Sequence, residues 1–248
     1  MCLFNSIFSK KVYPPFDISS LKVDMHSHLI PGIDDGSQSM EETIELLFKF
    51  QSLGFKKVIT TPHIKLGSFE NTSEIIRAGA DSVKEEISKT DGLNIEFEAA
   101  AEYFFDYSFM EKIEADDLLT FGNNHILVEY AFGQPPIGQK EMFFQLQMKG
   151  YRPILAHFER YGYYHGSIKK AEELREKGIL IQVNLCSFFG HYGPDVQKQA
   201  ELMLKENMID LVASDGHRIE HLNLVEEHLA HKNISALSEQ KLKNHIFL

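Results

Sequence analysis

The sequence contains histidines, aspartates and glutamates at spacings typical of metal ligands. The densest group is VDMHSHLIPGIDDGSQS, residues 23–39, where two histidines one residue apart precede a Pro-Gly turn and two aspartates. A buried core could not hold such side chains unpaired, and an exposed loop does not need them. A His-x-His pair alone is a weak signal, so the rest of the chain must decide whether this is a metal site.

Further residues of the same types follow in the segments TTPH, AAAEY, ILVEY, ILAHFER and VASDGH. Taken singly, each is more often a solvated or capped residue than a ligand. Together they are too many for one ion with an open position, because a metal takes roughly four to six donors. The nine candidates are His26, His28, Asp34, His63, Glu102, Glu129, His157, Asp215 and His217.

These donors suit a cluster of two or three ions bridged by a carboxylate and by water or hydroxide. Mixed imidazole and carboxylate donors favour manganese, iron or zinc, because magnesium and calcium prefer oxygen ligands alone.

The elements that must position these residues are short apolar runs alternating with helical patterns. Seven strand-then-helix units are predicted, with strands at 21–26, 56–63, 93–103, 125–131, 152–159, 179–187 and 209–217. Such runs between turn signals are typical of parallel strands buried on both faces. Glycines at 54, 150 and 178 stand where helices should end, and a last helix is expected from Ser235.

The candidate ligands fall at the carboxyl ends of six of these strands. In a parallel α/β barrel those ends share one face, and that face carries the active site. We therefore predict a single α/β domain, a distorted (β/α)7 TIM-like barrel at residues 21–248, after an N-terminal arm at 1–20. An open doubly wound sheet is the alternative.

Composition argues against several classes of protein. The 36 acidic and 25 basic residues give a net charge of −11, which does not suit a nucleic-acid partner. The two cysteines, Cys2 and Cys186, form no disulfide framework, so a reducing cytoplasm is expected. No apolar run is long enough for a transmembrane helix, and no membrane insertion is expected. Neither cysteine has an arginine six residues later, which excludes a thiol-based phosphatase mechanism.

The segments DMHSHLIPGIDDGS, TPH, ILVEY, LAHFERY and SDGH, in this order, resemble the polymerase-and-histidinol-phosphatase (PHP) superfamily. More closely, they are similar to its manganese-dependent bacterial tyrosine phosphatases, which are encoded in capsule and exopolysaccharide loci. The similarity covers about residues 22–230. It implies a cytoplasmic PHP-fold enzyme that uses two or three ions, with Mn²⁺ favoured over Fe or Zn. It also implies a phosphotyrosine protein as partner, namely the tyrosine-rich C-terminal tail of an autophosphorylating tyrosine kinase, and it is compatible with a homo-oligomer.

The resemblance distributes the nine donors over three ions, with Glu102 shared between two. The first ion would be held by His26, His28, Glu102 and Asp215, the second by Glu102, Glu129 and His157, and the third by Asp34, His63 and His217. Asp35 receives no ion, and Asp24 is expected to support a ligand or simply to end its strand rather than to bind an ion itself. Arg160, in HFERY, matches an arginine that contacts the substrate phosphate, and Arg218 is a looser match.

The mechanism implied is attack on a phosphomonoester by metal-bound hydroxide, which forms near neutral pH because the ion lowers the pKa of water to about 7. Arg160 would clamp the phosphate as a bidentate, permanently charged donor. A phenol has a pKa near 10, so its departure needs little protonation, although His157 or a metal-bound water could assist. Aromatic residues beside the ligands could line a slot for the substrate ring, with ordinary rim packing an equal alternative. These are Tyr103, Phe104, Phe105, Tyr130, Phe132 and Phe158.

Three other functions stay open at this point. A small-molecule phosphatase acting on a compound such as histidinol phosphate would use a similar site, although the Pro-Gly-Ile-Asp-Asp-Gly loop favours the tyrosine phosphatases. A metal-dependent amidohydrolase would leave Arg160 without a purpose. A non-enzymatic regulator stabilised by metal is the third. The stretch CSFFGHYG, 186–193, is shorter and more aromatic than the family pattern leads us to expect, so the pocket wall there is not predicted.

Overall fold

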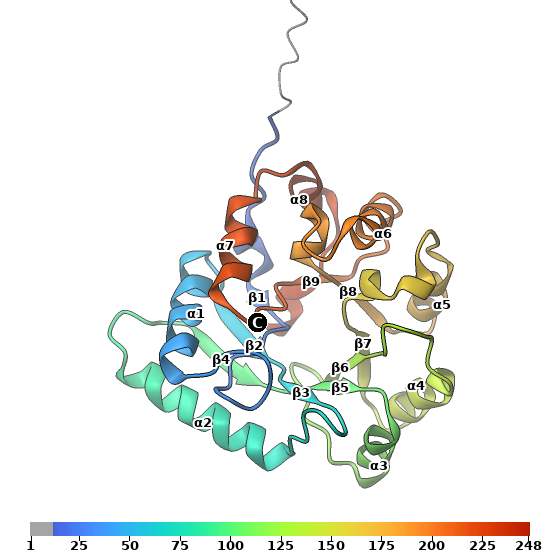
Figure 1. Cartoon of the computed structure of the whole chain (residues 1–248), viewed down its shortest axis with the longest axis horizontal. Helices are drawn as coiled ribbons and strands as arrows, with labels where there is room; N and C mark the ends of the chain where they lie inside the picture. The colour runs from blue at the N-terminus through green and yellow to red at the C-terminus, as the bar shows by residue number, and fades with distance from the viewer. Residues whose placement is uncertain (1–11) are drawn as a thin grey trace, which may run out of the picture.

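The computed structural model describes residues 12–248, and its helices surround a set of short strands (Figure 1). The strands are β1 (Val23–Asp24), β2 (Lys57–Thr60), β3 (His63–Ile64), β4 (Glu96–Ala99), β5 (Glu102–Phe104), β6 (His125–Glu129), β7 (Arg152–Leu155), β8 (Leu180–Asn184) and β9 (Leu211–Ala213). The α-helices are α1 (Met40–Ser52), α2 (Ser73–Lys89), α3 (Tyr107–Ala115), α4 (Gln139–Met148), α5 (Lys169–Glu176), α6 (Pro194–Lys205), α7 (Ile219–Glu227) and α8 (Lys232–Ser235).

The strands pair in parallel and form two sheets. One has the order β1-β2-β4, and the other has the order β3-β5-β6-β7-β8-β9. At one edge of each sheet, Ser27 forms a parallel bridge with Gly216, and the His28 N–H donates to the Gly216 carbonyl at 2.9 Å. The prediction of a single α/β domain with parallel strands is confirmed.

Two of the predicted strands are interrupted at matching positions. The predicted strand 56–63 divides into β2 and β3, and 93–103 divides into β4 and β5. Pro62 contributes to the break because it has no N–H to donate to a ladder. The two segments nevertheless stay paired across the break, since the Glu102 N–H donates to the Pro62 carbonyl at 3.1 Å. Beyond the break His63 pairs with Glu102 in register, so both side chains reach the carboxyl end of the sheet together.

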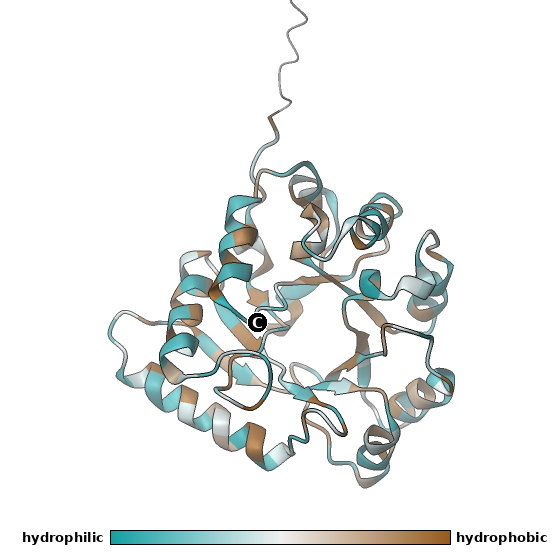
Figure 2. Cartoon of the chain, in the orientation of Figure 1, coloured by the Kyte–Doolittle hydropathy of each residue, from teal (hydrophilic) through white to brown (hydrophobic). Residues whose placement is uncertain are grey.

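The core lies between the strands and the inner faces of the helices. Every residue of β2 and of β6 is buried, as expected for strands covered on both faces. Helix α1 buries Leu46, Leu47 and Phe50, and Ser39 caps its first turn by accepting from the Glu42 N–H. Figure 2 shows apolar and polar residues on different sides of the helices. Within residues 12–248, none of the helices combines the length and apolar character needed to cross a bilayer.

Both ends of the described chain pack on this core. Residues 1–11 of the predicted arm, including Cys2, lie outside the described residues, whereas Phe16 and Ile18 are buried in the main core. The prediction of a helix starting at Ser235 is wrong, because α8 ends there and only 3-10 turns follow. Farther along, the Asn244 amide donates to the Val212 carbonyl at 2.6 Å and ties the end of the chain to β9.

Candidate active site

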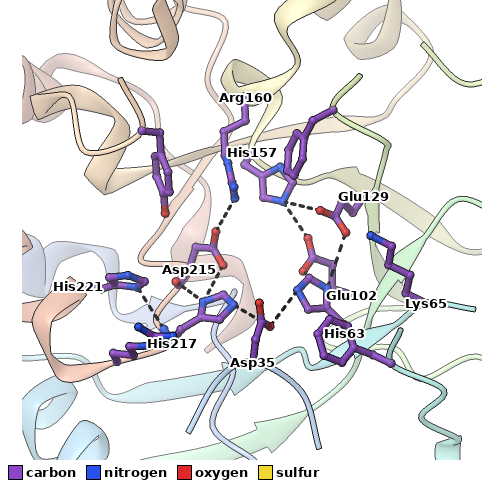
Figure 3. A pocket seen from close by; sticks show the side chains of 14 residues that line it. Asp35, His63, Lys65, Glu102, Glu129, His157, Arg160, Asp215, His217 and His221 are labelled. Atoms are coloured by element: carbon purple, nitrogen blue, oxygen red, sulfur yellow. Dashed lines mark hydrogen bonds and ion pairs between the residues drawn. The ribbon is translucent and has the colours of Figure 1, made fainter. Parts of the chain in front are cut away.

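Side chains from the carboxyl ends of the strands converge on one cavity of about 390 Å³ (Figure 3). Parallel strands place residues far apart in sequence at a common edge, which is how this cavity gathers its lining. The lining residues are Asp35, His63, Lys65, Phe69, Glu102, Glu129, Phe132, His157, Arg160, Tyr192, Asp215, His217, Arg218 and His221.

At the base of the cavity, two imidazoles and two carboxylates point at one another. The Nε2 atom of His26 lies 3.2 Å from Glu102 Oε2 and 3.4 Å from Asp215 Oδ1. The Nε2 atom of His28 lies 3.5 Å from each of the same two oxygens. Each imidazole therefore lies within 3.5 Å of both carboxylates, and the ligand atoms of His26, His28 and Glu102 all lie within 4.8 Å of one another, close enough to hold a metal ion. The group is buried and has the chemistry of a metal site.

Glu102 faces donors on both of its oxygens. Its Oε2 atom lies 3.0 Å from His63 Nδ1, yet neither atom has a hydrogen-bond partner among the described residues. Its Oε1 atom lies 3.0 Å from His157 Nε2. Glu129 adds oxygens 3.7 Å from His63 Nδ1 and 3.8 Å from His157 Nε2. The two oxygens of Glu102 face different imidazoles, which suits a carboxylate that bridges two ions.

The two adjacent aspartates have different surroundings from those predicted. Asp35, which received no ion, lies 3.6 Å from His63 Nε2 and 3.4 Å from His217 Nε2, and these three residues form a possible metal group with His28. Asp34, the predicted ligand, instead accepts from His28 Nδ1 at 2.7 Å, from the His63 N–H at 3.1 Å and from the Gly36 N–H at 3.0 Å. The structure therefore brings Asp35 rather than Asp34 into the cavity. The turn that follows is tight, because a Cβ on Gly36 would collide with His28.

The clustered charges shift the pKa values of these groups. Burial would lower the pKa of His26, but Glu102 and Asp215 outweigh burial and raise it to about 9. Burial raises the pKa of Glu129, and the charge of Glu102 raises it further. Burial lowers the pKa of His157 to about 4 despite its hydrogen bond with Glu102. A divalent cation would favour the ionised carboxylates and neutral imidazoles that metal binding requires.

Arg160 is held over one side of this group. It follows β7 and donates from Nη1 to Asp215 Oδ2 at 3.2 Å. Its guanidinium carbon lies 4.5 Å from the ring centroids of both Phe132 and Tyr192, so the planar group is stacked between two aromatic faces. Arg160 thus has a fixed plane beside the candidate metal ligands. The looser match Arg218 lines this cavity and also an adjoining cavity of about 690 Å³.

The aromatic lining differs from the predicted slot. Tyr103, Tyr130 and Phe158 are fully buried, so for these residues the packing alternative is the correct one. Phe104 and Phe105 do not line the cavity either, and Phe132 is the one predicted member that does.

Two further aromatic residues of the lining, Phe69 and Tyr192, were not predicted. The Phe69 ring stacks on His63 with centroids 5.3 Å apart. Tyr192 belongs to the aromatic stretch 186–193, which was the sequence signal for this wall.

Buried imidazoles and carboxylates at the ends of parallel strands, with an arginine beside them, define this protein as a metal-dependent hydrolase of the α/β class. Comparison with known proteins then identifies the family. The chain belongs to the capsular polysaccharide synthesis family CpsB/CapC, whose model matches residues 22–236.

Two curated relatives and one solved structure illustrate the similarity. The chain is 28% identical to the tyrosine-protein phosphatase YwqE of Bacillus subtilis, over 81% of this chain and 79% of the relative. It is also 28% identical to the tyrosine-protein phosphatase CpsB of Streptococcus pneumoniae, over 80% of this chain and 84% of the relative. A structure described as YwqE and CpsB, metal-dependent tyrosine phosphatases, shares the fold with a TM-score of 0.74 at 24% identity, covering 89% of this chain and 96% of the solved one.

Proposed function

We propose that this chain is a metal-dependent protein-tyrosine phosphatase. The observation that carries the proposal is one cavity that holds both the His–Glu–Asp cluster and the stacked Arg160. A cluster of cations beside a bidentate arginine matches phosphoryl transfer, which depends on positioning and charge neutralisation. The two curated relatives named as tyrosine-protein phosphatases support the same reaction.

We assign two or three ions to the cavity, with Mn²⁺ as the expected metal and Fe or Zn as alternatives, because the donors mix imidazole and carboxylate. The assignment keeps the predicted sets and replaces Asp34 by Asp35. The proposed ligands are His26, His28, Asp35, His63, Glu102, Glu129, His157, Asp215 and His217. When bound, the ions supply an activated water near neutral pH and neutralise the phosphoryl oxygens.

The chain's own residues orient the substrate. Arg160 presents N–H groups in a fixed plane, and a phosphate oxygen pair can accept two of them at once. His157 serves better as a ligand than as a proton donor, because its lowered pKa of about 4 leaves it neutral near pH 7. A phenolate needs no strong acid to leave, which fits a site without a dedicated proton donor.

Selectivity for an aryl phosphate follows from the aromatic rim. Phe132 is 42% exposed, although its ring packs against the Arg160 guanidinium. A phosphate bound at Arg160 would bring a tyrosine ring alongside Phe132, where offset ring contacts stabilise aromatic groups by roughly 0.5–1.5 kcal/mol. An aliphatic phosphoester would lack that contact.

We further infer that the two sheets form one distorted seven-stranded barrel, with the Ser27–Gly216 bridge joining their edges. For the partner, we infer a cytoplasmic phosphotyrosine protein of capsule synthesis, namely the tyrosine-rich tail of an autophosphorylating kinase. The match to a capsular polysaccharide synthesis family supports this choice.

A substrate comparison tests the proposed function. Manganese-loaded protein is incubated with a phosphotyrosine peptide or with histidinol phosphate, and phosphate release is measured. We expect turnover of the peptide, its loss in Arg160→Ala with metal content retained, and little change in Arg152→Ala. Arg152 is a suitable control because it begins β7, at the end of that strand away from the cavity, and does not line the cavity. Preferential turnover of histidinol phosphate would instead indicate a small-molecule phosphatase.

A further inference from the structure

Strand β8 contributes two buried amide side chains to the base of the candidate metal cluster. Gln182 and Asn184 lie two residues apart, so both project from the same face of the strand. Both are completely buried. The corresponding predicted strand, 179–187, ended in no metal-ligand type, and its contribution was missed for that reason.

The two amides form a directional chain of hydrogen bonds. Gln182 Nε2 donates to Asn184 Oδ1 at 2.8 Å, and Asn184 Nδ2 donates to Asp215 Oδ2 at 2.7 Å. Gln182 Oε1 is left as an acceptor, and it lies 3.2 Å from His26 Nδ1 and 2.8 Å from the His157 backbone nitrogen. The two amides therefore form hydrogen bonds with three of the proposed ligands, His26, His157 and Asp215.

The direction of these bonds decides which ligand atoms remain free. Because Gln182 Oε1 can only accept, His26 donates to it from Nδ1. In the neutral imidazole that metal binding requires, Nε2 then carries the lone pair, and this atom faces Glu102. Because Asn184 occupies Asp215 Oδ2, the other oxygen, Oδ1, is the one that faces His26.

Gln182 also restrains the backbone of His157. The φ angle of His157 is +31°, a left-handed conformation that is costly for a residue with a side chain. The hydrogen bond from its N–H to Gln182 holds this conformation in a fully buried place.

The backbone of Asn184 forms a further hydrogen bond. The Asn184 N–H donates to Glu159 Oε1 at 3.0 Å, and Glu159 precedes Arg160 in sequence. One strand thus supports the ligands and the segment that carries the phosphate-binding arginine.

We propose that Gln182 and Asn184 are positioning residues that orient His26, His157 and Asp215 for metal binding, an inference that rests on the proposed metal-dependent function. Outer hydrogen-bond partners of ligands fix the imidazole tautomer, and their loss typically costs 10- to 100-fold in metal affinity.

The test compares Mn²⁺ binding in Gln182→Met with that in Gln199→Met. Gln199 is a matched control: its side chain is also buried, it accepts from the Gly166 N–H and donates to the Ser167 carbonyl, and it lies on α6. Each variant loses the hydrogen bonds of one buried side-chain amide, so both should have a lower melting temperature without added metal. Titration calorimetry should show Mn²⁺ affinity about 10- to 100-fold weaker in Gln182→Met and unchanged in Gln199→Met.

Asn184→Leu gives a second measurement if Gln182→Met does not fold. It removes the donor to Asp215 Oδ2 without adding a charge, so we expect the same loss of affinity. Wild-type Mn²⁺ affinity in any folded variant of these two positions would overturn the positioning role. Failure of the wild-type protein to bind Mn²⁺, Fe²⁺ or Zn²⁺ would instead overturn the proposed metal-dependent function, so the two failures are distinguishable.

Discussion

The adjacent aspartates Asp34 and Asp35 offer a sharp test, because the structure gives them opposite roles. The matched substitutions Asp34→Asn and Asp35→Asn remove one charge each with almost no change in shape. Asp34 Oδ2 accepts both from His28 Nδ1 and from the His63 N–H, and Oδ1 accepts from the Gly36 N–H. An amide cannot accept on both atoms, so at least one buried donor loses its partner in Asp34→Asn.

The expected magnitudes follow from these contacts. An unsatisfied buried donor costs about 1–3 kcal/mol, and about 2–4 °C of melting temperature per kcal/mol applies to a chain of this size. Asp34→Asn should therefore melt roughly 2–12 °C lower. The Asp35 side chain is 56% exposed, so Asp35→Asn should change the free energy of unfolding by less than about 0.5 kcal/mol.

Metal content separates the two variants in the other direction. Asp35→Asn should lose the ion shared with His63 and His217. Asp34→Asn retains every proposed ligand and should keep all of its ions. Melting curves without metal and elemental analysis after manganese loading provide the two readouts. Loss of one ion and an unchanged melting temperature in Asp34→Asn, together with full metal occupancy in Asp35→Asn, would refute the assignment.

Three more outcomes are expected from the same site. Arg160→Lys keeps the charge but loses the stacked plane and the bidentate geometry, so kcat/KM for p-nitrophenyl phosphate should fall at least about tenfold with metal content unchanged. Phe132→Ala should weaken turnover of phosphotyrosine more than that of phosphoserine, and Phe144→Ala, which is 57% exposed on α4, should alter neither. Chelation should lower the melting temperature, because Mn²⁺ at 100 times its Kd stabilises the folded state by about 2.7 kcal/mol, and added Mn²⁺ should restore it.

Residue types and periodicity were enough to predict the parallel α/β fold, because buried parallel strands leave a distinct apolar signature between turns. The same pattern located the strand ends and hence the meeting of His26 with Asp215, which the structure places 3.4 Å apart. It could not tell Asp34 from Asp35, since adjacent residues in a turn differ only in which way the backbone aims them. It also gave no sign of Gln182, because an amide in an apolar strand shows its role only through its partners.

Sequence could not decide between an aromatic slot and ordinary packing for a related reason. Tyr103 follows a candidate ligand directly in sequence, and successive residues of a strand point to opposite faces. Its ring is therefore buried beneath the site, where its hydroxyl accepts from the Leu119 N–H at 2.7 Å. The rim comes instead from loops, at Phe69, Phe132 and Tyr192, whose direction periodicity does not predict.

The central claim is that these clustered side chains bind the ions that hydrolyse phosphotyrosine. Its most direct test is a titration of chelator-treated protein with Mn²⁺, with phosphate release from a phosphotyrosine peptide and bound manganese measured in the same samples. We predict no turnover without metal and a rise that saturates at two to three bound ions per chain. Full turnover in protein that holds no metal, or saturated binding with no phosphate release, would contradict the account.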